Sequence, residues 1–133
     1  MYRSINRWLL ISLVFILTLG ACSQVGGGDM VLTEEDNSKT IQLNSGQKLS
    51  ITLEGNPTTG YTWEVESPET GPLEQLGEPE FEPSSDALGA GGKITLHFQA
   101  TSSGEMLLRL VYHRPWEQGV PPEKTFEVKV VVE

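Results

Sequence analysis

Apolar and polar residues alternate one by one along several short stretches of this chain, as in β-strands that bury one face. No helical periodicity appears after residue 21, and glycine or small polar residues suit tight turns between the stretches. The predicted strands are residues 40–43, 48–53, 61–65, 79–82, 93–99, 106–113 and 124–132. About seven to eight short strands predict an all-β, antiparallel β-sandwich in a single domain. An additional strand near residues 73–76 would have to be a side excursion, that is, one that does not change the end of the sandwich at which the later connections lie.

Trp63 is expected in the core, and stacking on a ligand is its alternative role.

The first 21 residues have the features of an export signal. Arg3 and Arg7 precede an apolar run at residues 8–19, which is shorter than the roughly 20 residues that cross a membrane and suits a signal peptide. The run ends in Leu19-Gly20-Ala21-Cys22, which resembles the bacterial lipoprotein signal. This resemblance implies that residues 1–21 are removed and that Cys22 carries lipid. A plain secretory signal with an accidental cysteine is the alternative.

Cys22 also bears on localisation and stability. It is the only cysteine, so no intramolecular disulfide can form and stability must come from the core. The protein is expected to be exported and lipid-anchored to the bacterial cell envelope, at the outer membrane if there are two, because Ser23 follows Cys22 instead of an aspartate. Residues 22–37 contain three consecutive glycines and an acidic triplet and are predicted to be a flexible tether. A calcium site at that triplet is disfavoured because the spacing of calcium ligands is missing.

Removal of the signal leaves a strongly acidic mature chain of residues 22–133, with the predicted domain at residues 38–133. Arg3 and Arg7 leave with the signal, so the formal net charge falls from −9 for the whole chain to −11 for the mature chain. Such a surface repels nucleic acid and anionic lipid. We therefore expect no nucleic-acid partner and no polybasic membrane contact, and we predict a monomer without cofactor or metal.

Three unusual turn motifs lie between predicted strands. If each strand crosses the sandwich once, alternate connections lie at the same end, so the motifs should form one surface. The motifs are Asn56-Pro57-Thr58-Thr59-Gly60, then Gly89-Ala90-Gly91-Gly92 preceded by Leu88, then Arg114-Pro115-Trp116.

The first motif should form a shaped turn. Pro57 fixes one backbone angle, Asn56 can bond the backbone of the turn, and Gly60 permits a positive φ. Thr58 and Thr59 are then expected to be held out with their hydroxyls exposed. An ordinary hairpin turn is the alternative.

The other two motifs offer backbone and aromatic surface. The glycine motif has almost no side chains, so its backbone can pair with another backbone, and Leu88 could enter a pocket. A flexible connection is the alternative, whereas phosphate binding lacks the Lys-Ser/Thr that it needs. Arg114 and Trp116 are residue types enriched at interface hot spots, although Trp116 could instead fold onto the core.

These motifs in this order, with Tyr61 and Trp63 after the first, resemble the chagasin family of cysteine peptidase inhibitors over about residues 38–133. The resemblance implies an immunoglobulin-like sandwich and reversible, tight-binding inhibition of papain-like cysteine peptidases. It implies that Thr58 and Thr59 cover the catalytic cysteine and histidine. The glycine motif and Leu88 would lie on the non-primed side of the cleft, and Arg114 and Trp116 on the primed side.

Two other functions compete with inhibition. A lipid-anchored adhesion or envelope-assembly module would use the same fold. An enzyme is disfavoured, because His97 and His113 have no nucleophile or paired carboxylate at a recognisable spacing.

Overall fold

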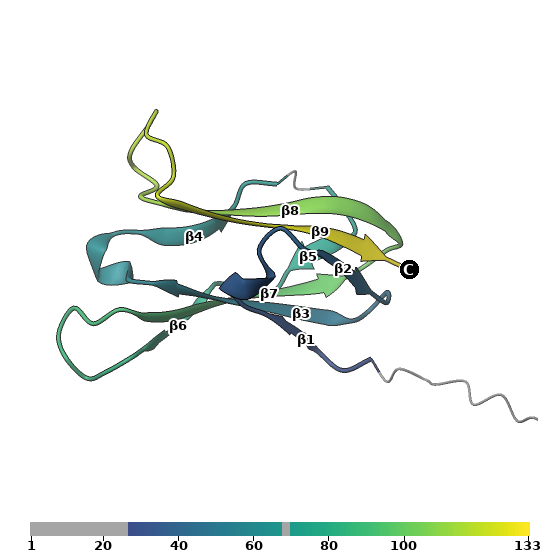
Figure 1. The fold of residues 1–133 in the computed structure, drawn as a ribbon, viewed down its shortest axis with the longest axis horizontal. Coiled ribbons are helices and arrows are strands. Elements are labelled where there is room, and N and C mark those ends of the chain that lie inside the picture. The colour runs from purple at the N-terminus through teal and green to yellow at the C-terminus, as the bar shows by residue number, and fades with distance from the viewer. Residues whose placement is uncertain (1–26, 68–69) are drawn as a thin grey trace, which may run out of the picture.

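Two β-sheets packed face to face make up the protein (Figure 1). The computed structural model describes residues 27–67 and 70–133. The strands are β1 (Met30–Leu32), β2 (Thr40–Leu43), β3 (Lys48–Gly55), β4 (Thr62–Val65), β5 (Leu73–Gln75), β6 (Glu80–Pro83), β7 (Gly92–Ala100), β8 (Gly104–His113) and β9 (Lys124–Val132). Two 3-10 turns, η1 (Glu34–Asp36) and η2 (Pro57–Thr59), interrupt them. The all-β sandwich and all seven predicted strands are confirmed, each strand within two residues at both ends.

The sheets have five and four strands. In the first, β3 and β7 are central, β1 pairs with β3, and both β5 and β6 pair with β7; the second runs β2-β9-β8-β4. β5 is the additional strand considered near residues 73–76. β1 is a strand that the alternation of apolar and polar residues did not predict.

The core lies between the sheets and is made of the inward residues of the alternating strands. Trp63 is only 3% exposed and belongs to this core, which confirms its predicted place. Burying each large apolar side chain contributes about 1.5–3 kcal/mol. The fully buried large side chains are Leu43, Leu49, Ile51, Leu53, Leu96, Phe98, Leu108, Leu110, Phe126, Val128 and Val130.

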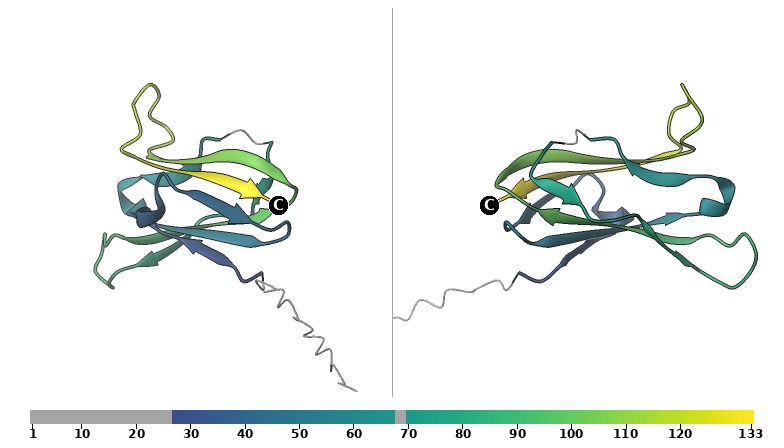
Figure 2. Two further views of the ribbon diagram at one scale, coloured as in Figure 1. Left: turned by 45° about the vertical axis from the view of Figure 1, so that its right-hand side comes forward. Right: turned by 180° about the vertical axis from the view of Figure 1, so that it is seen from behind.

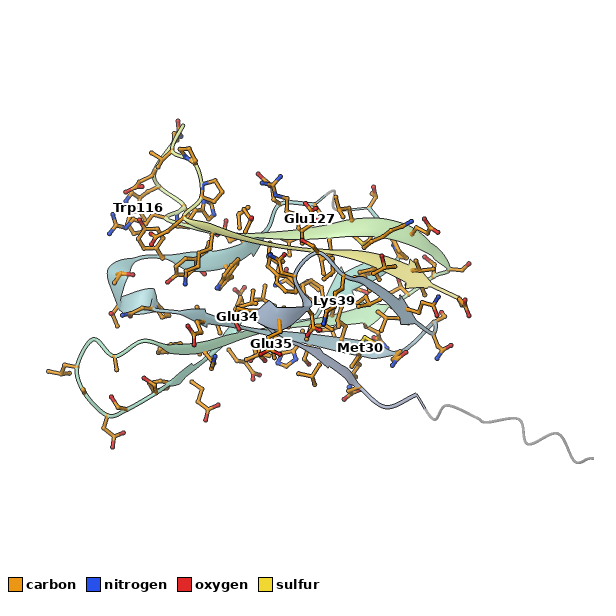
Figure 3. All side chains as sticks on the ribbon, viewed as in Figure 1. Met30, Glu34, Glu35, Lys39, Trp116 and Glu127 are labelled. Atoms are coloured by element: carbon orange, nitrogen blue, oxygen red, sulfur yellow. The ribbon has the colours of Figure 1, made fainter. Side chains whose placement is uncertain are left out.

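Most strand pairs are antiparallel, as predicted, but two edge pairs are parallel. β1 runs parallel to β3, with Met30 opposite Leu49, and β2 runs parallel to β9, with Ile41 opposite Val130. β1 and β2 are consecutive strands in different sheets, and η1 carries the chain between them (Figure 3). Parallel strands cannot be joined by a short hairpin turn, so the sequence contains no turn motif from which these two pairs could be predicted.

The prediction of a flexible tether is wrong for residues 30–37, where the chain is already part of the fold. Leu32 is 5% exposed and belongs to the core. The side chain of Asn37 accepts a hydrogen bond from the backbone N–H of Glu127 at 2.9 Å. In η1 the Asp36 carboxylate bonds both Lys39 and the backbone of Thr33, which together hold the pKa of Asp36 below its usual value.

Part of the N-terminal prediction cannot be compared with the structure. The export signal at residues 1–21 and Cys22 lie outside the described residues. None of the described segments forms a helix with the length and hydrophobicity that crossing a bilayer requires.

The two ends of the sandwich differ. The described chain starts near the turn between β2 and β3, where Gln47 donates a hydrogen bond to the carbonyl of Gly28 at 2.8 Å. The C-terminal residue lies at the same end, because the N–H of Ser45 bonds the carbonyl of Glu133 at 3.0 Å. The β3–β4, β6–β7 and β8–β9 connections lie at the opposite end (Figures 1 and 2).

Candidate functional site: three loops at one end of the sandwich

The structure brings the three sequence motifs together. They lie in the first loop (residues 56–61, between β3 and β4), the second loop (84–91, between β6 and β7) and the third loop (114–123, between β8 and β9). We call these three loops together the loop end. Strand geometry alone places them side by side, and side-chain hydrogen bonds then join them.

The first loop is a closed turn built around Asn56. The carboxamide oxygen of Asn56 accepts a hydrogen bond from the backbone N–H of Thr58 at 3.2 Å, and Gly60 ends the turn in the left-handed region with φ of 84°. The hydroxyl of Thr58 donates to the Asn56 side chain, and that of Thr59 donates to the Asn56 carbonyl at 2.6 Å. Both threonines are exposed, as predicted, but their hydroxyls are already engaged. The Thr58 N–H and the Thr59 carbonyl are also bonded within the loop end, so mainly the methyl groups remain for contact with a partner.

The second loop closes the hairpin formed by β6 and β7. Gly89 has a positive φ of 76°. At Gly92 a Cβ would lie 2.0 Å from the backbone oxygen of Glu82, so the close approach of β6 and β7 requires a glycine there. Leu88 is fully exposed, which fits its predicted role as an apolar contact.

Part of the backbone of the second loop is used within the protein. The carbonyl of Gly89 accepts a hydrogen bond from the Asn56 side chain at 3.0 Å, which ties the second loop to the first. The N–H of Ala90 bonds the carbonyl of Ala87, and the carbonyl of Gly91 accepts from Ser84. The predicted backbone pairing with a partner is therefore limited to the remaining groups.

Trp116 in the third loop neither enters the core nor stands free. Its side chain is 67% exposed and lies at the loop end (Figure 3). A Cβ added to Gly60 would lie 2.2 Å from the Trp116 ring, so the indole rests directly on the first loop. Pro115, beside it, is exposed. Trp116 thus presents an aromatic surface whose position is supported by Gly60.

Arg114 holds the third loop on the first. Its Nε donates to the carbonyl of Thr59 at 3.1 Å, its Nη1 pairs with Glu117 at 3.1 Å, and its guanidinium lies 4.5 Å above the Tyr61 ring. The hydrogen bond to Glu117 raises the pKa of Arg114 above its usual value. A hydrogen bond to Glu123 likewise raises the pKa of the Tyr61 hydroxyl. The cation predicted to reach a partner is therefore largely committed inside the loop end.

Two tyrosines support the site, and the part that Tyr112 plays in it was not predicted from the sequence. Tyr61 and Tyr112 stack with ring centroids 5.2 Å apart, and Tyr112 in turn contacts Trp63 at 5.1 Å. The alternation along residues 106–113 indicates that Tyr112 faces inward. It does not show that the side chain reaches the first loop.

The loop end offers shape and contact surface rather than reactive groups. In residues 27–67 and 70–133, no three His, Cys, Asp or Glu side chains gather as metal ligands would. His113 is paired with Glu64 at 2.8 Å, and His97 lies 2.9 Å from the Ser50 hydroxyl on the first sheet. The exposed groups of the loop end are therefore suited to binding the surface of another protein.

Comparison with known proteins gives the relatives of this chain. The family model described as "Chagasin family peptidase inhibitor I42" matches residues 42–130. Amoebiasin-1 from Entamoeba histolytica is 38% identical over 106 residues, covering 78% of this chain and all of that protein. Chagasin from Trypanosoma cruzi is 35% identical over 89 residues, covering 64% of this chain and 81% of that protein. The solved structure of a cysteine protease inhibitor from Entamoeba histolytica has a TM-score of 0.65 and 25% identity, covering 78% of this chain and 94% of its own. The chain therefore belongs to the chagasin family of peptidase inhibitors.

Proposed function

We propose that this protein inhibits papain-like cysteine peptidases reversibly by placing its three loops in the active-site cleft. The observation that carries the proposal is the joining of the three motifs into one surface. Asn56 bonds the second loop through Gly89, and Arg114 bonds the first loop through Thr59. Membership of a family of peptidase inhibitors supports the same function and disfavours an adhesion module.

The contacts can be assigned loop by loop. A papain-like peptidase has a thiolate–imidazolium pair at the centre of its cleft. Thr58 and Thr59 lie over that pair, Leu88 and the glycine motif lie on one side of it, and Trp116 lies on the other. No covalent bond forms, because the loops only exclude substrate. Loops that are ordered before binding lower the entropy cost of association, and an interface on the order of 1,600 Å² is sufficient.

Purified residues 27–133 should inhibit papain competitively. Papain activity is measured with a small fluorogenic substrate over a series of inhibitor concentrations. Replacement of Thr58, Thr59 and Trp116 by alanine together should weaken inhibition while the circular dichroism spectrum stays unchanged. Full papain activity at a large molar excess of the folded fragment would exclude the proposed function. Undiminished inhibition by the triple variant would show that the loops are the wrong site.

We also propose that the protein is exported and held on the bacterial cell envelope by lipid on Cys22. The support is the sequence pattern: a basic start, an apolar run, and small residues directly before the only cysteine. In a bacterial host, the mature protein should begin at Cys22, carry the mass of lipid, and sediment with membranes. Cys22→Ser should remove both properties, and identical fractionation of the two proteins would overturn the anchor.

A further inference from the structure

Tyr112 is a core residue whose side-chain hydroxyl makes a hydrogen bond at the loop end. It lies on β8 two residues before Arg114 and is 5% exposed. Its hydroxyl accepts a hydrogen bond from the backbone N–H of Asn56 at 2.7 Å. A side chain fixed in the core thus reaches the residue around which the first loop is built.

The same residue also supports the third loop. The backbone carbonyl of Tyr112 accepts a hydrogen bond from the N–H of Glu123 at 2.9 Å, which closes the base of that loop. Its ring stacks on Tyr61, and Tyr61 carries the Arg114 guanidinium on its own ring. Tyr112 is therefore connected to the start of the first loop, to the residue that follows Gly60, and to the base of the third loop.

The end of β3 is shaped to receive Tyr112. A Cβ at Gly55 would lie 2.4 Å from the Ile94 side chain and 3.2 Å from the Tyr112 ring, so a larger residue there would disturb this packing. One residue earlier, the carbonyl of Glu54 accepts a hydrogen bond from the Trp63 indole at 3.1 Å. Two core aromatics thus fix the backbone on either side of Gly55, immediately before the first loop.

We propose that Tyr112 is a positioning residue for inhibition. Its hydroxyl fixes the backbone of Asn56, and the Asn56 carboxamide then fixes Gly89 in the second loop. The β3–β7 pairing brings the first two loops side by side, and the Tyr112 hydroxyl, acting through Asn56, fixes how they are held there. This inference rests on the proposed function, because a fixed loop arrangement matters only if both loops enter the same cleft. Loops held in place beforehand lose less conformational freedom on binding.

The substitution Tyr112→Phe in residues 27–133 tests this role, because it removes the hydroxyl and keeps the ring packing. A hydrogen bond of ordinary strength corresponds to a change of about 3- to 10-fold in an equilibrium constant. The inhibition constant for papain should rise by about that factor. Amide hydrogen exchange should become faster at Asn56 and in the second loop, and should stay unchanged in β9.

Thr52→Val is the matched control. It also removes one hydroxyl, from the Thr52–Thr95 pair at 3.0 Å on β3 and β7, at about 13 Å along the strand from Asn56. It should lower stability to a similar degree and leave both the inhibition constant and loop exchange unchanged. Equal inhibition constants for the unmodified and Tyr112→Phe proteins would overturn the inference, and so would equal weakening by both substitutions. Failure of the unmodified fragment to inhibit would instead overturn the proposed function, which is a distinct result.

Discussion

Trp116 packs against the first loop and also presents a large exposed surface, so its contributions to stability and to inhibition can be measured separately. It covers Gly60 and yet leaves 67% of its surface exposed. Trp116→Ala should change the free energy of unfolding by no more than about 0.5–1 kcal/mol, as exposed substitutions do. It should raise the inhibition constant for papain by about 30-fold or more, the size expected of an interface hot spot.

Thermal unfolding and inhibition assays on the same preparation check both halves of this prediction. Val120→Ala is the control, because Val120 is an exposed apolar residue of the same loop. The assignment of Trp116 to the interface fails if the two substitutions weaken inhibition equally. A large loss of stability in Trp116→Ala would show that the indole serves the fold instead.

Sequence reasoning at the level of residues succeeded where a local pattern was sufficient. Alternation placed Trp63 in the core, and turn chemistry identified Asn56 and Gly60. It failed where an atom's partner lies far along the chain. Asn56 bonds a carbonyl 33 residues away, and Arg114 bonds one 55 residues away. Such bonds decide which groups remain available to a peptidase, and no local rule predicts them.

At the level of elements, the long strands were predictable and β1 was not. A strand of nine or ten residues shows several periods of alternation, whereas β1 has only three residues and precedes an acidic turn that looks like a linker. Its place in the sheet depends on pairing with β3 and on the burial of Leu32. Both are tertiary effects that override weak local preference.

The contribution of β1 can be measured by truncation. A fragment of residues 38–133, which starts at the predicted domain boundary, should unfold with a free energy about 2–4 kcal/mol lower than residues 27–133. Loss of Leu32 from the core accounts for most of this difference. Urea unfolding of both fragments checks it, with Leu32→Ala in the longer fragment expected to reproduce much of the loss. Equal midpoints for the two fragments would mean that β1 adds nothing to the fold.

At the level of the whole molecule, the described chain begins at the end of the sandwich opposite the loop end, which bears on the proposed attachment at Cys22. The described chain begins beside the β2–β3 turn, and the loop end lies at the far side of the sandwich (Figure 2). The ten residues of β8 span about 33 Å between these ends. Attachment at Cys22 would therefore direct the three loops away from a membrane and leave them open to a peptidase in solution.

Chemical coupling tests this orientation without depending on lipidation in a cell. A fragment of residues 22–133 has Cys22 as its only thiol and can be coupled to vesicles that carry maleimide lipids. It should inhibit papain with the same constant on vesicles as in solution, because the loops face outward. A second fragment with Cys22→Ser and Gln118→Cys would be coupled through the exposed third loop. It should inhibit in solution and lose inhibition on vesicles, because the bilayer then covers the site. Loss of inhibition on coupling through Cys22 would show that the loops do not project away from the point of attachment.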